Sequence, residues 1–400
     1  MPPLLQPINI RIVLRYLIIL LFPLGIASFI PFVYALFLRD WFLAFSFFMV
    51  FMILFPSGFI LIRFIPERSF GFGEGLSIVA ISYPIASLIA ALPLVFGGNM
   101  PWIDACFETI SGFTTTGFTM VKPENLPQPL ILWRAITQWI GGMGFVILYI
   151  GFIISPGSPI SKLFSPQTEE ERLPLPLNKL ASVILKVYII FTLIGILCLL
   201  LAGLSLFDAL CFTFSTISTG GFAPYSSSAG YFSSLSVHII LISLMIIGAL
   251  NFTLFYKIIY LKQGLRRRLM TLITNPQLIA LFFIILVAFI ILKASLGIDT
   301  VPLIFTIISA QTNTGLSLNL PINPLPKLLS LLIPLMFIGG SIASTTGGIK
   351  LFRLIVALKI LHRIIMKPML PKEIVLPCIY KGEHLREEEI KTILLLIITQ

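Results

Sequence analysis

The sequence predicts an all-α polytopic membrane protein built from tandem repeats of helix, re-entrant pore loop and helix. Three observations predict this fold class: an apolar composition, charge-free stretches long enough to cross a bilayer, and a short motif that occurs three times. Hydrophobic residues make up 58% of the 400 residues and charged residues 11%. Because a soluble domain has about 25% charged residues, this composition excludes a soluble enzyme, a nucleic-acid-binding protein and a disordered scaffold.

Charge-free stretches set the predicted membrane spans, since a spanning helix needs about 20 mainly apolar residues. The stretches that meet this length are Tyr16–Leu38, Trp41–Ile62, Gly75–Ile103, Ala135–Ser161, Val187–Phe207, Leu269–Leu292 and Leu328–Ile349. Two other apolar stretches are not simple spans: Ala209–Tyr256 is too long for one crossing, and Thr300–Pro326 is broken by prolines. We expect both to contain segments that enter the membrane and return, and a third such segment follows Gly98.

The basic residues predict the orientation, because cytoplasmic loops of membrane proteins are enriched in Lys and Arg. With the N-terminus in the cytoplasm, 22 of the 27 basic residues are internal. The five external ones are Arg39, Lys122, Arg134, Lys293 and Lys327. This bias predicts a multi-pass protein of the plasma membrane with a cytoplasmic N-terminus.

An internal repeat aligns without gaps on Gly117, Gly221 and Gly315. In each copy a serine lies six positions before the glycine and a hydroxyl residue three before it. The serines are Ser111, Ser215 and Ser309, and the hydroxyl residues are Thr114, Ser218 and Thr312. Each copy falls on the external side between two spans, which predicts a re-entrant half-helix followed by a tail rich in Ser, Thr and Gly.

Such tails predict a carbonyl-lined passage for a cation. Non-helical backbone at membrane depth is tolerated only where protein encloses it or where it lines a wet cavity. Glycine permits positive φ, and rings of carbonyl oxygens replace the hydration shell of an ion. A single motif of this kind is more often a helix-packing site, but three copies in register favour a filter. Asp104, Asp208 and Asp299 are interpreted as N-caps, and Glu108, which the other copies lack, as structural.

The last long apolar stretch predicts a broken helix. Leu328–Leu361 exceeds the membrane thickness, and its middle, Gly339–Gly348, reads Gly-Gly-Ser-Ile-Ala-Ser-Thr-Thr-Gly-Gly. Four glycines in ten residues do not hold a regular helix. We expect a flexible loop just inside the filter, with a small-residue packing groove as the alternative.

These features divide the chain into five predicted parts. They are an N-terminal pair of transmembrane helices (1–70), pore repeat one (71–160), pore repeat two (161–268), pore repeat three with a broken second helix (269–372), and a linker with the start of an incomplete fourth repeat (373–400).

Several motifs together resemble the Trk/Ktr/HKT potassium transporter family, and in particular the pore subunit of its Trk branch. TTTGFT at Thr114–Thr119 and WRAITQWIGGMG at Trp133–Gly144 are similar to the first repeat of that family. STGGFAPYSSSAGYF at Ser218–Phe232 is similar to the second repeat, and FIGGSIASTTGGIKLFR at Phe337–Arg353 to the intramembrane gate loop of the third.

The resemblance implies potassium uptake through a pseudo-four-fold pore with a selectivity filter and a gate. The implied potassium-binding residues are Thr114, Thr115, Thr116, Gly117, Phe118, Ser218, Thr219, Gly220, Gly221, Phe222, Thr312, Asn313, Thr314, Gly315 and Leu316. The implied gate residues are Gly339, Gly340, Ser341, Ser344, Thr345, Thr346, Gly347, Gly348 and Lys350. It also implies a homodimer on a cytoplasmic ring of nucleotide-binding regulatory subunits, with no resident cofactor and no nucleic acid.

The sequence departs from the family pattern in the gate loop and in its repeats. Ile342 and Thr346 stand where small residues are usual, and three complete repeats are recognised without a fourth. A non-conducting or truncated paralogue acting as a membrane scaffold therefore remains an alternative, as does a sodium-permeable transporter. An enzyme is not expected: no HExxH motif occurs, and His238 lies alone in an apolar stretch, where we expect it to be packed and hydrogen-bonded. Channel-like and ion-coupled (symport) movement both stay open.

Overall fold

The computed structural model describes residues 8–64, 72–153, 177–260, 266, 270, 273–319, 325–369, 378–380, 383–384 and 387–398. The chain divides into two compact units, each treated separately below. The first comprises Met1–Leu148, Phe191–Leu244 and Thr314–Leu318, and the second Tyr149–Ile190, Met245–Asn313 and Asn319–Gln400. The predicted boundaries between repeats, near residues 70, 160, 268 and 372, lie outside the described residues.

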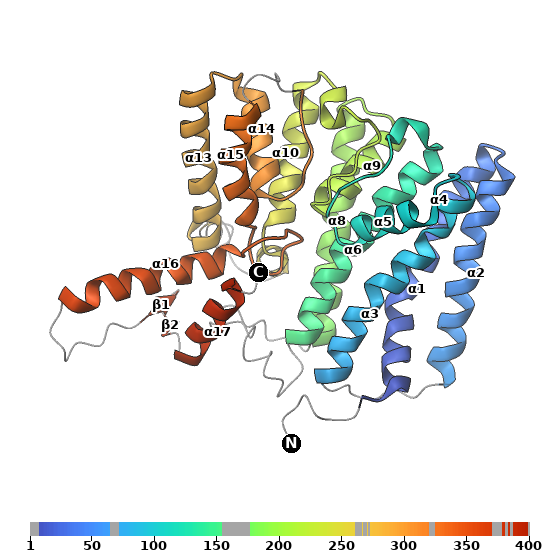
Figure 1. Cartoon of the computed structure of the whole chain (residues 1–400), viewed down its shortest axis with the longest axis horizontal. Coiled ribbons are helices and arrows are strands. Elements are labelled where there is room, and N and C mark those ends of the chain that lie inside the picture. The colour runs from blue at the N-terminus through green and yellow to red at the C-terminus, as the bar shows by residue number, and fades with distance from the viewer. Residues whose placement is uncertain are drawn as a thin grey trace. The chain divides into compact units, whose positions relative to one another are not determined.

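The first unit is helical, and α1 packs along α2 as a helical hairpin (Figure 1). Its elements are α1 (Ile10–Phe37), α2 (Trp41–Phe64), α3 (Phe72–Ala90), α4 (Leu92–Phe96), α5 (Trp102–Phe113), η2 (Pro123–Asn125), α9 (Leu206–Ile217), η3 (Ser228–Tyr231), and the parts of α6 (Gln128–Ile153), α8 (Leu177–Leu201) and α10 (Leu235–Ala249) within its ranges.

In the second unit, α16 runs across the direction of α13 and α15 (Figure 1). Beyond its shares of α6, α8 and α10, this unit contains α11 (Phe252–Tyr260), α13 (Pro276–Leu296), α14 (Thr300–Gln311), α15 (Leu325–Phe337), α16 (Leu351–Met366), η4 (Lys367–Met369), β1 (Ile379–Tyr380), β2 (Glu383–His384) and α17 (Glu387–Ile398). The two strands form an antiparallel pair in which Tyr380 lies opposite Glu383.

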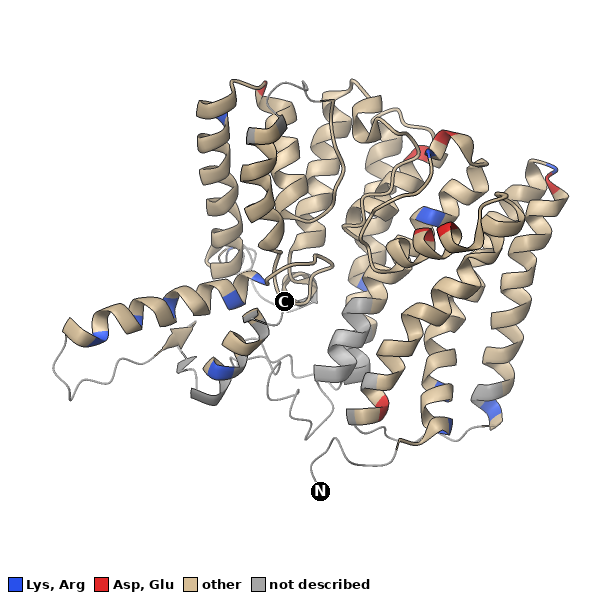
Figure 2. Cartoon of the chain, viewed as in Figure 1, with Lys and Arg blue, Asp and Glu red and all other residues tan. Residues whose placement is uncertain are grey.

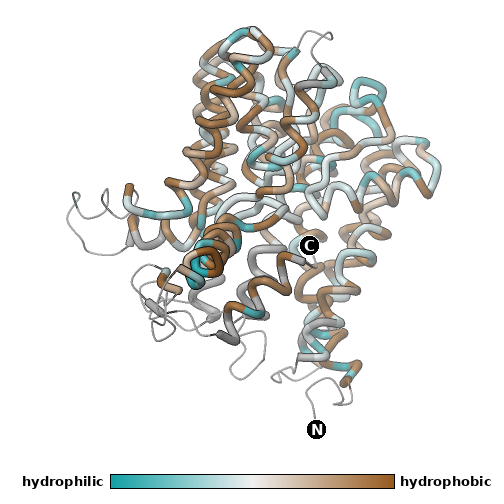
Figure 3. Tube along the Cα trace, turned by 60° about the vertical axis from the view of Figure 1, so that its left-hand side comes forward, coloured by the Kyte–Doolittle hydropathy of each residue, from teal (hydrophilic) through white to brown (hydrophobic). Residues whose placement is uncertain are grey.

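Long apolar helices confirm the predicted class of all-α polytopic membrane protein. Among the described residues, five helices are long and apolar enough to cross a membrane: Ile10–Phe37, Trp41–Ile60, Gly73–Phe96, Ser182–Leu201 and Pro276–Leu296. Hydrophobic positions run along these helices (Figure 3), and charged positions are sparse on them (Figure 2). The fifth begins later than the charge-free stretch from Leu269 predicts, because Asn275 caps it by accepting a hydrogen bond from the Gln277 amide.

The helices α5, α9 and α14 are among those too short to cross, with 12 residues each. At 1.5 Å per residue such a helix is about 18 Å long, against about 30 Å of hydrocarbon. Each occupies one of the three repeat motifs. The interpretation of the three aspartates as N-caps is right for Asp299 by position, although its side chain makes no capping bond. Asp104 and Asp208 instead lie in the first turn, after Pro101 and Ser205 at the N-cap positions.

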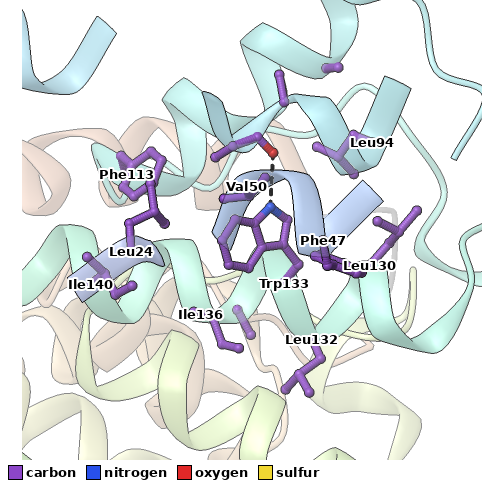
Figure 4. Close-up of a cluster of buried hydrophobic side chains, with 14 of the residues drawn as sticks. Leu24, Phe47, Val50, Leu94, Phe113, Leu130, Leu132, Trp133, Ile136 and Ile140 are labelled. Carbon is purple, nitrogen blue, oxygen red and sulfur yellow. Dashed lines mark hydrogen bonds between the residues drawn. The ribbon is translucent and has the colours of Figure 1, made fainter. Parts of the chain in front are cut away.

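The core of the first unit surrounds Trp133 of α6, which is fully buried (Figure 4). Its indole Nε1 donates a hydrogen bond of 3.0 Å to the carbonyl oxygen of Ala90, at the end of α3. The Phe47 ring of α2 meets it edge-on with centroids 5.7 Å apart. Leu94 of α4 and Leu24 of α1 belong to the same cluster. One aromatic side chain thus joins α6, which carries several site residues, to the N-terminal helices.

We expect Trp133→Ala to lower the free energy of unfolding by about 3–5 kcal/mol, because it removes a buried aromatic side chain and leaves a cavity. Trp133→Phe keeps most of the volume and loses the hydrogen bond to Ala90, so its loss should be smaller. Thermal unfolding of the detergent-solubilised protein measures both. Phe59→Ala, at a side chain of α2 that is 67% exposed, is the control. Equal losses for Trp133→Ala and Phe59→Ala would contradict this assignment of the core.

Candidate ion-binding segments and gate loop

The three short helices end in the same way. Thr114, Ser218 and Thr312 are their C-cap residues. Each hydroxyl donates to the carbonyl oxygen four residues earlier: to Ile110 at 2.8 Å, to Phe214 at 2.7 Å and to Ile308 at 2.8 Å. The hydroxyl that recurs three positions before each glycine therefore ends a helix. The structure gives it a local role that the alignment alone did not reveal.

The three candidate ion-binding segments begin with these cap residues and comprise residues 114–118, 218–222 and 312–316. They have the same backbone conformation at two equivalent positions. The second residue of each has φ close to +54°: 53° at Thr115, 54° at Thr219 and 55° at Asn313. The fourth is the repeat glycine, with φ of 81° in every copy. Positive φ is unusual for β-branched residues and costs of order 1–3 kcal/mol where it persists. Such strain is held twice at threonine, in equivalent positions of the first two segments. It also leaves the backbone carbonyls free to turn to one side.

Neighbouring segments lie in contact in the first unit. A Cβ built on Gly117 would lie 2.3 Å from the carbonyl oxygen of Gly220, and one built on Gly221 would lie 2.0 Å from that of Thr314. Gly117 and Gly221 thus each face the carbonyl of the residue directly before the glycine of the next repeat. The Cβ position of Gly315 has no described atom within 4 Å. Segment one is therefore in contact with segment two, and segment two with Thr314 of the third, whereas no described atom packs on the Cβ position of Gly315.

The residues predicted as one ion-binding set are distributed over both units. The first two segments and Thr314–Leu316 belong to the first unit, whereas Thr312 and Asn313 belong to the second. There the Asn313 side-chain amide donates to the carbonyl oxygen of Met336 at 2.8 Å. The residues after the glycines differ: Phe118 is 70% exposed, whereas Phe222 and Leu316 are buried.

The outer loops that follow the segments are tied to one another. The Glu124 carboxylate accepts hydrogen bonds from the Ser226 hydroxyl and amide, both at 2.6 Å. These two bonds lower the pKa of the Glu124 carboxyl. The Gly230 amide donates to the Ser317 carbonyl at 3.1 Å. The loops of repeats one and two, and of repeats two and three, are thereby joined within the first unit.

The predicted gate loop lies between α15, which ends at Phe337, and α16, which begins at Leu351. Its base is closed by hydrogen bonds from the Gly339 amide to the Ile349 carbonyl (2.9 Å) and from the Ile349 amide to the Phe337 carbonyl (2.8 Å). A Cβ on Gly339 would lie 1.8 Å from the Gly347 carbonyl oxygen, so a side chain at that position is excluded.

The tip of the loop packs on the end of α10. The Ser341 amide donates to the Ala249 carbonyl at 2.8 Å. The Thr345 amide and hydroxyl both donate to the Gly248 carbonyl, at 3.2 and 3.0 Å. The last carbonyl groups of a helix have no partner within it. The loop supplies those partners, so the end of α10 and the backbone of the loop satisfy each other.

Lys350 is buried and holds the loop from the end that leads into α16. Its ammonium group donates to the carbonyl and hydroxyl oxygens of Thr346, and the Ser344 hydroxyl lies 3.4 Å away. The Thr346 hydroxyl in turn accepts the Gly340 amide at 2.8 Å. Thr346, noted in the sequence as larger than usual in the family, therefore joins both arms of the loop.

Two glutamines make hydrogen bonds that the sequence alone does not assign to them. Gln138 of α6 accepts the Phe222 amide at 3.0 Å. Gln277 of α13 accepts the Ile342 amide at 3.1 Å and donates to the Tyr380 hydroxyl at 3.2 Å, so it links the gate loop to the small strand pair. His238 meets its expectation: it is buried, and its Nε2 lies 2.9 Å from the Phe232 carbonyl oxygen.

Known proteins match this chain over most of its length. A cation transporter of Methanocaldococcus jannaschii is 32% identical over 83% of this chain and 68% of its own length. The Trk system potassium uptake protein TrkG of Escherichia coli is 31% identical over 72% of this chain and 61% of TrkG. The Trk system potassium uptake protein TrkH of Halomonas elongata is 29% identical over 76% of this chain and 65% of that protein. The matched part thus spans between 61 and 68% of these relatives.

A solved structure and a protein-family model also match this chain. The crystal structure of the potassium transporter TrkH from Vibrio parahaemolyticus superposes with a TM-score of 0.81 at 25% identity, covering 97% of this chain and 82% of that one. The TrkH family of cation transport proteins matches residues 45–271, more than half of the chain. This chain therefore belongs to the TrkH family of cation transport proteins.

Proposed function

We propose that this chain forms the pore of a potassium uptake system in the plasma membrane. The observation that carries the proposal is the common geometry of the three segments, with positive φ at equivalent residues and direct contact between neighbours. Such segments present several carbonyl oxygens to one ion, and a ring of carbonyls replaces the water that a monovalent cation loses. Potassium is the substrate here, and no resident cofactor is proposed.

The names of the relatives support the choice of ion. TrkG and TrkH are Trk system potassium uptake proteins, and the Vibrio parahaemolyticus structure is of a potassium transporter. The Methanocaldococcus jannaschii relative is named only as a cation transporter. Sodium permeation is therefore the second candidate. A comparison of potassium and sodium uptake distinguishes the two, and absence of both fluxes would support the non-conducting scaffold.

The order of contacts supports a pore of four walls. If each glycine faces the carbonyl of the next segment, a fourth segment would pack on the open side of Gly315 and return to the first. We propose that such a segment completes the pathway. The basic internal loops support a cytoplasmic N-terminus, and a homodimer on a ring of nucleotide-binding regulatory subunits remains part of this proposal.

The gate is assigned to the loop from Gly339 to Gly348 together with Lys350. Within the second unit, a Cβ built on Gly347 would lie 3.9 Å from the side-chain nitrogen of Asn313, so the loop comes close to the third segment. The hydrogen bonds from the buried Lys350 side chain to Thr346 support a closed state, since they tie the loop to the start of α16.

We expect Gly117→Ala and Gly221→Ala to lower the ratio of potassium to sodium uptake by about tenfold or more, because each adds a carbonyl collision to the cost of positive φ, about 1–2 kcal/mol for a non-glycine residue. Gly315→Ala carries only the cost of positive φ and should lower the ratio of potassium to sodium uptake by less. Gly203→Ala is the matched control, with φ of 93° and no described neighbour within 4 Å. Ion uptake by a potassium-uptake-deficient strain measures the ratios. Unchanged ratios in all three repeat-glycine variants would overturn the filter assignment.

Deletion of Ser344–Gly348 should raise potassium flux several-fold, because it removes the segment that Lys350 holds across the broken helix. Thr346→Val removes one hydroxyl with three hydrogen-bond partners, Gly340, Ser344 and Lys350, and should give a smaller increase. Thr274→Val is the control, since the Thr274 hydroxyl bonds only within its own turn, to the Met270 carbonyl. Flux into proteoliposomes under a potassium gradient is the measurement. A reduced or unaltered flux in the deletion variant would exclude an obstructing loop.

A further inference from the structure

A buried ion pair lies directly behind the first ion-binding segment. The Arg134 Nε of α6 is 2.6 Å from the Glu108 Oε1 of α5, and both side chains are at most 2% exposed. From the sequence alone, Arg134 is expected among the external loop charges and Glu108 is expected to be structural. The structure shows Arg134 inside α6 and paired, so its assignment to a loop is wrong.

The Glu108 carboxylate fixes the chain that leaves the first segment. Its Oε1 accepts the Thr119 hydroxyl at 2.9 Å, and its Oε2 accepts the Met120 amide at 3.0 Å. These residues follow Phe118, the last residue of that segment. One carboxylate thus ties the exit of the segment back to the helix that leads into it.

Arg134 connects Glu108 and Thr119 to the second segment. Its Nη2 donates to the Thr119 hydroxyl at 3.0 Å. Its guanidinium carbon lies 4.2 Å from the centre of the Phe222 ring, a cation–π contact with the residue directly after Gly221. Phe222 is therefore held by its ring to a group that also holds the exit of segment one.

Gln138, one turn further along α6, holds Phe222 from its backbone. Its Oε1 accepts the Phe222 amide, and a Cβ built on Gly220 would lie 2.4 Å from its side-chain amide carbon. The amide group therefore packs against the back of the second segment. Arg134 and Gln138 are four residues apart and so share one face of α6.

A buried ion pair is a costly way to obtain stability alone, because an apolar pair of similar volume is often at least as stable. Its advantage is a fixed geometry of charged hydrogen bonds. The equivalent positions to Glu108 in the other repeats are Phe212 and Thr306, so the device belongs to repeat one. The charged groups act on the exits of two segments whose separation sets the size of the ion site.

We infer that Arg134 and Glu108, supported by Gln138, are positioning residues that fix the spacing of the first two ion-binding segments and thereby set ion selectivity. They do not touch the ion. The inference rests on the proposed function, because it assigns these residues to the filter of that same potassium pathway.

The test uses the double variant Glu108→Leu/Arg134→Met in the full chain, which replaces the pair with apolar side chains of similar size and leaves no charge unpaired. We expect it to fold and to conduct, with the ratio of potassium to sodium uptake lowered by about tenfold, the effect of about 1.4 kcal/mol of differential ion binding. Arg134→Lys keeps the charge and loses the Nη2 bond to Thr119, and should give a smaller loss. A merely structural pair predicts a changed melting temperature with an unchanged ratio.

Thr192→Val in α8 is the matched control, since the Thr192 hydroxyl accepts a hydrogen bond from the indole of Trp139, which lies on α6 as Arg134 does. It should leave the ratio at the wild-type value. A wild-type ratio in a folded double variant overturns the inference. If the double variant does not fold, a wild-type ratio in Arg134→Lys overturns it. If the double variant keeps the wild-type ratio while the repeat-glycine variants lose selectivity, the positioning role is wrong and the proposed function stands. If the wild-type protein itself shows no preference for potassium, the proposed function is wrong.

Discussion

The structure depends on one constraint: backbone polar groups that leave a helix inside the membrane need partners other than water. The first two ion-binding segments meet it through the helices that precede them. The amides of Thr116 and Gly220 donate to the carbonyls of Ser111 and Ser215, at 2.9 and 2.8 Å. The backbone carbonyl of the recurring serine therefore accepts a hydrogen bond from the amide of the residue directly before the repeat glycine. These two amides are thus satisfied within the helix that leads into each segment.

The gate loop meets the same constraint by a different route. Its amides are bound by the carbonyls at the end of α10 and by its own two arms, through Ser341, Thr345 and the Gly339–Ile349 pair. The amides of Thr116 and Gly220 are bound within their own repeats, whereas the loop is held by contacts with a neighbouring helix and by Lys350. A loop whose partners lie on another element can exchange them, which fits a movable part better than a fixed one.

Charge is used sparingly and at positions that matter. In the described membrane helices of the first unit, Glu108 and Arg134 are buried together beside the segments, where low dielectric strengthens their attraction. In the second unit Lys350 is buried among hydroxyl and carbonyl oxygens. The first arrangement gives fixed geometry, and the second places a buried, hydrogen-bonded lysine beside the loop that interrupts the third repeat.

The sequence alone determined the membrane class, the three repeats and the break between α15 and α16, because hydropathy, register and glycine content are local properties. It did not determine where α13 begins, since the cap at Asn275 outweighs the apolar run before it. Only the tertiary structure showed which neighbours lie at Gly117, Gly221 and Gly315. It also showed the pairing of Arg134 with Glu108 and the roles of Gln138 and Gln277. Each joins residues from different helices, and no spacing along one chain encodes which buried polar groups will meet.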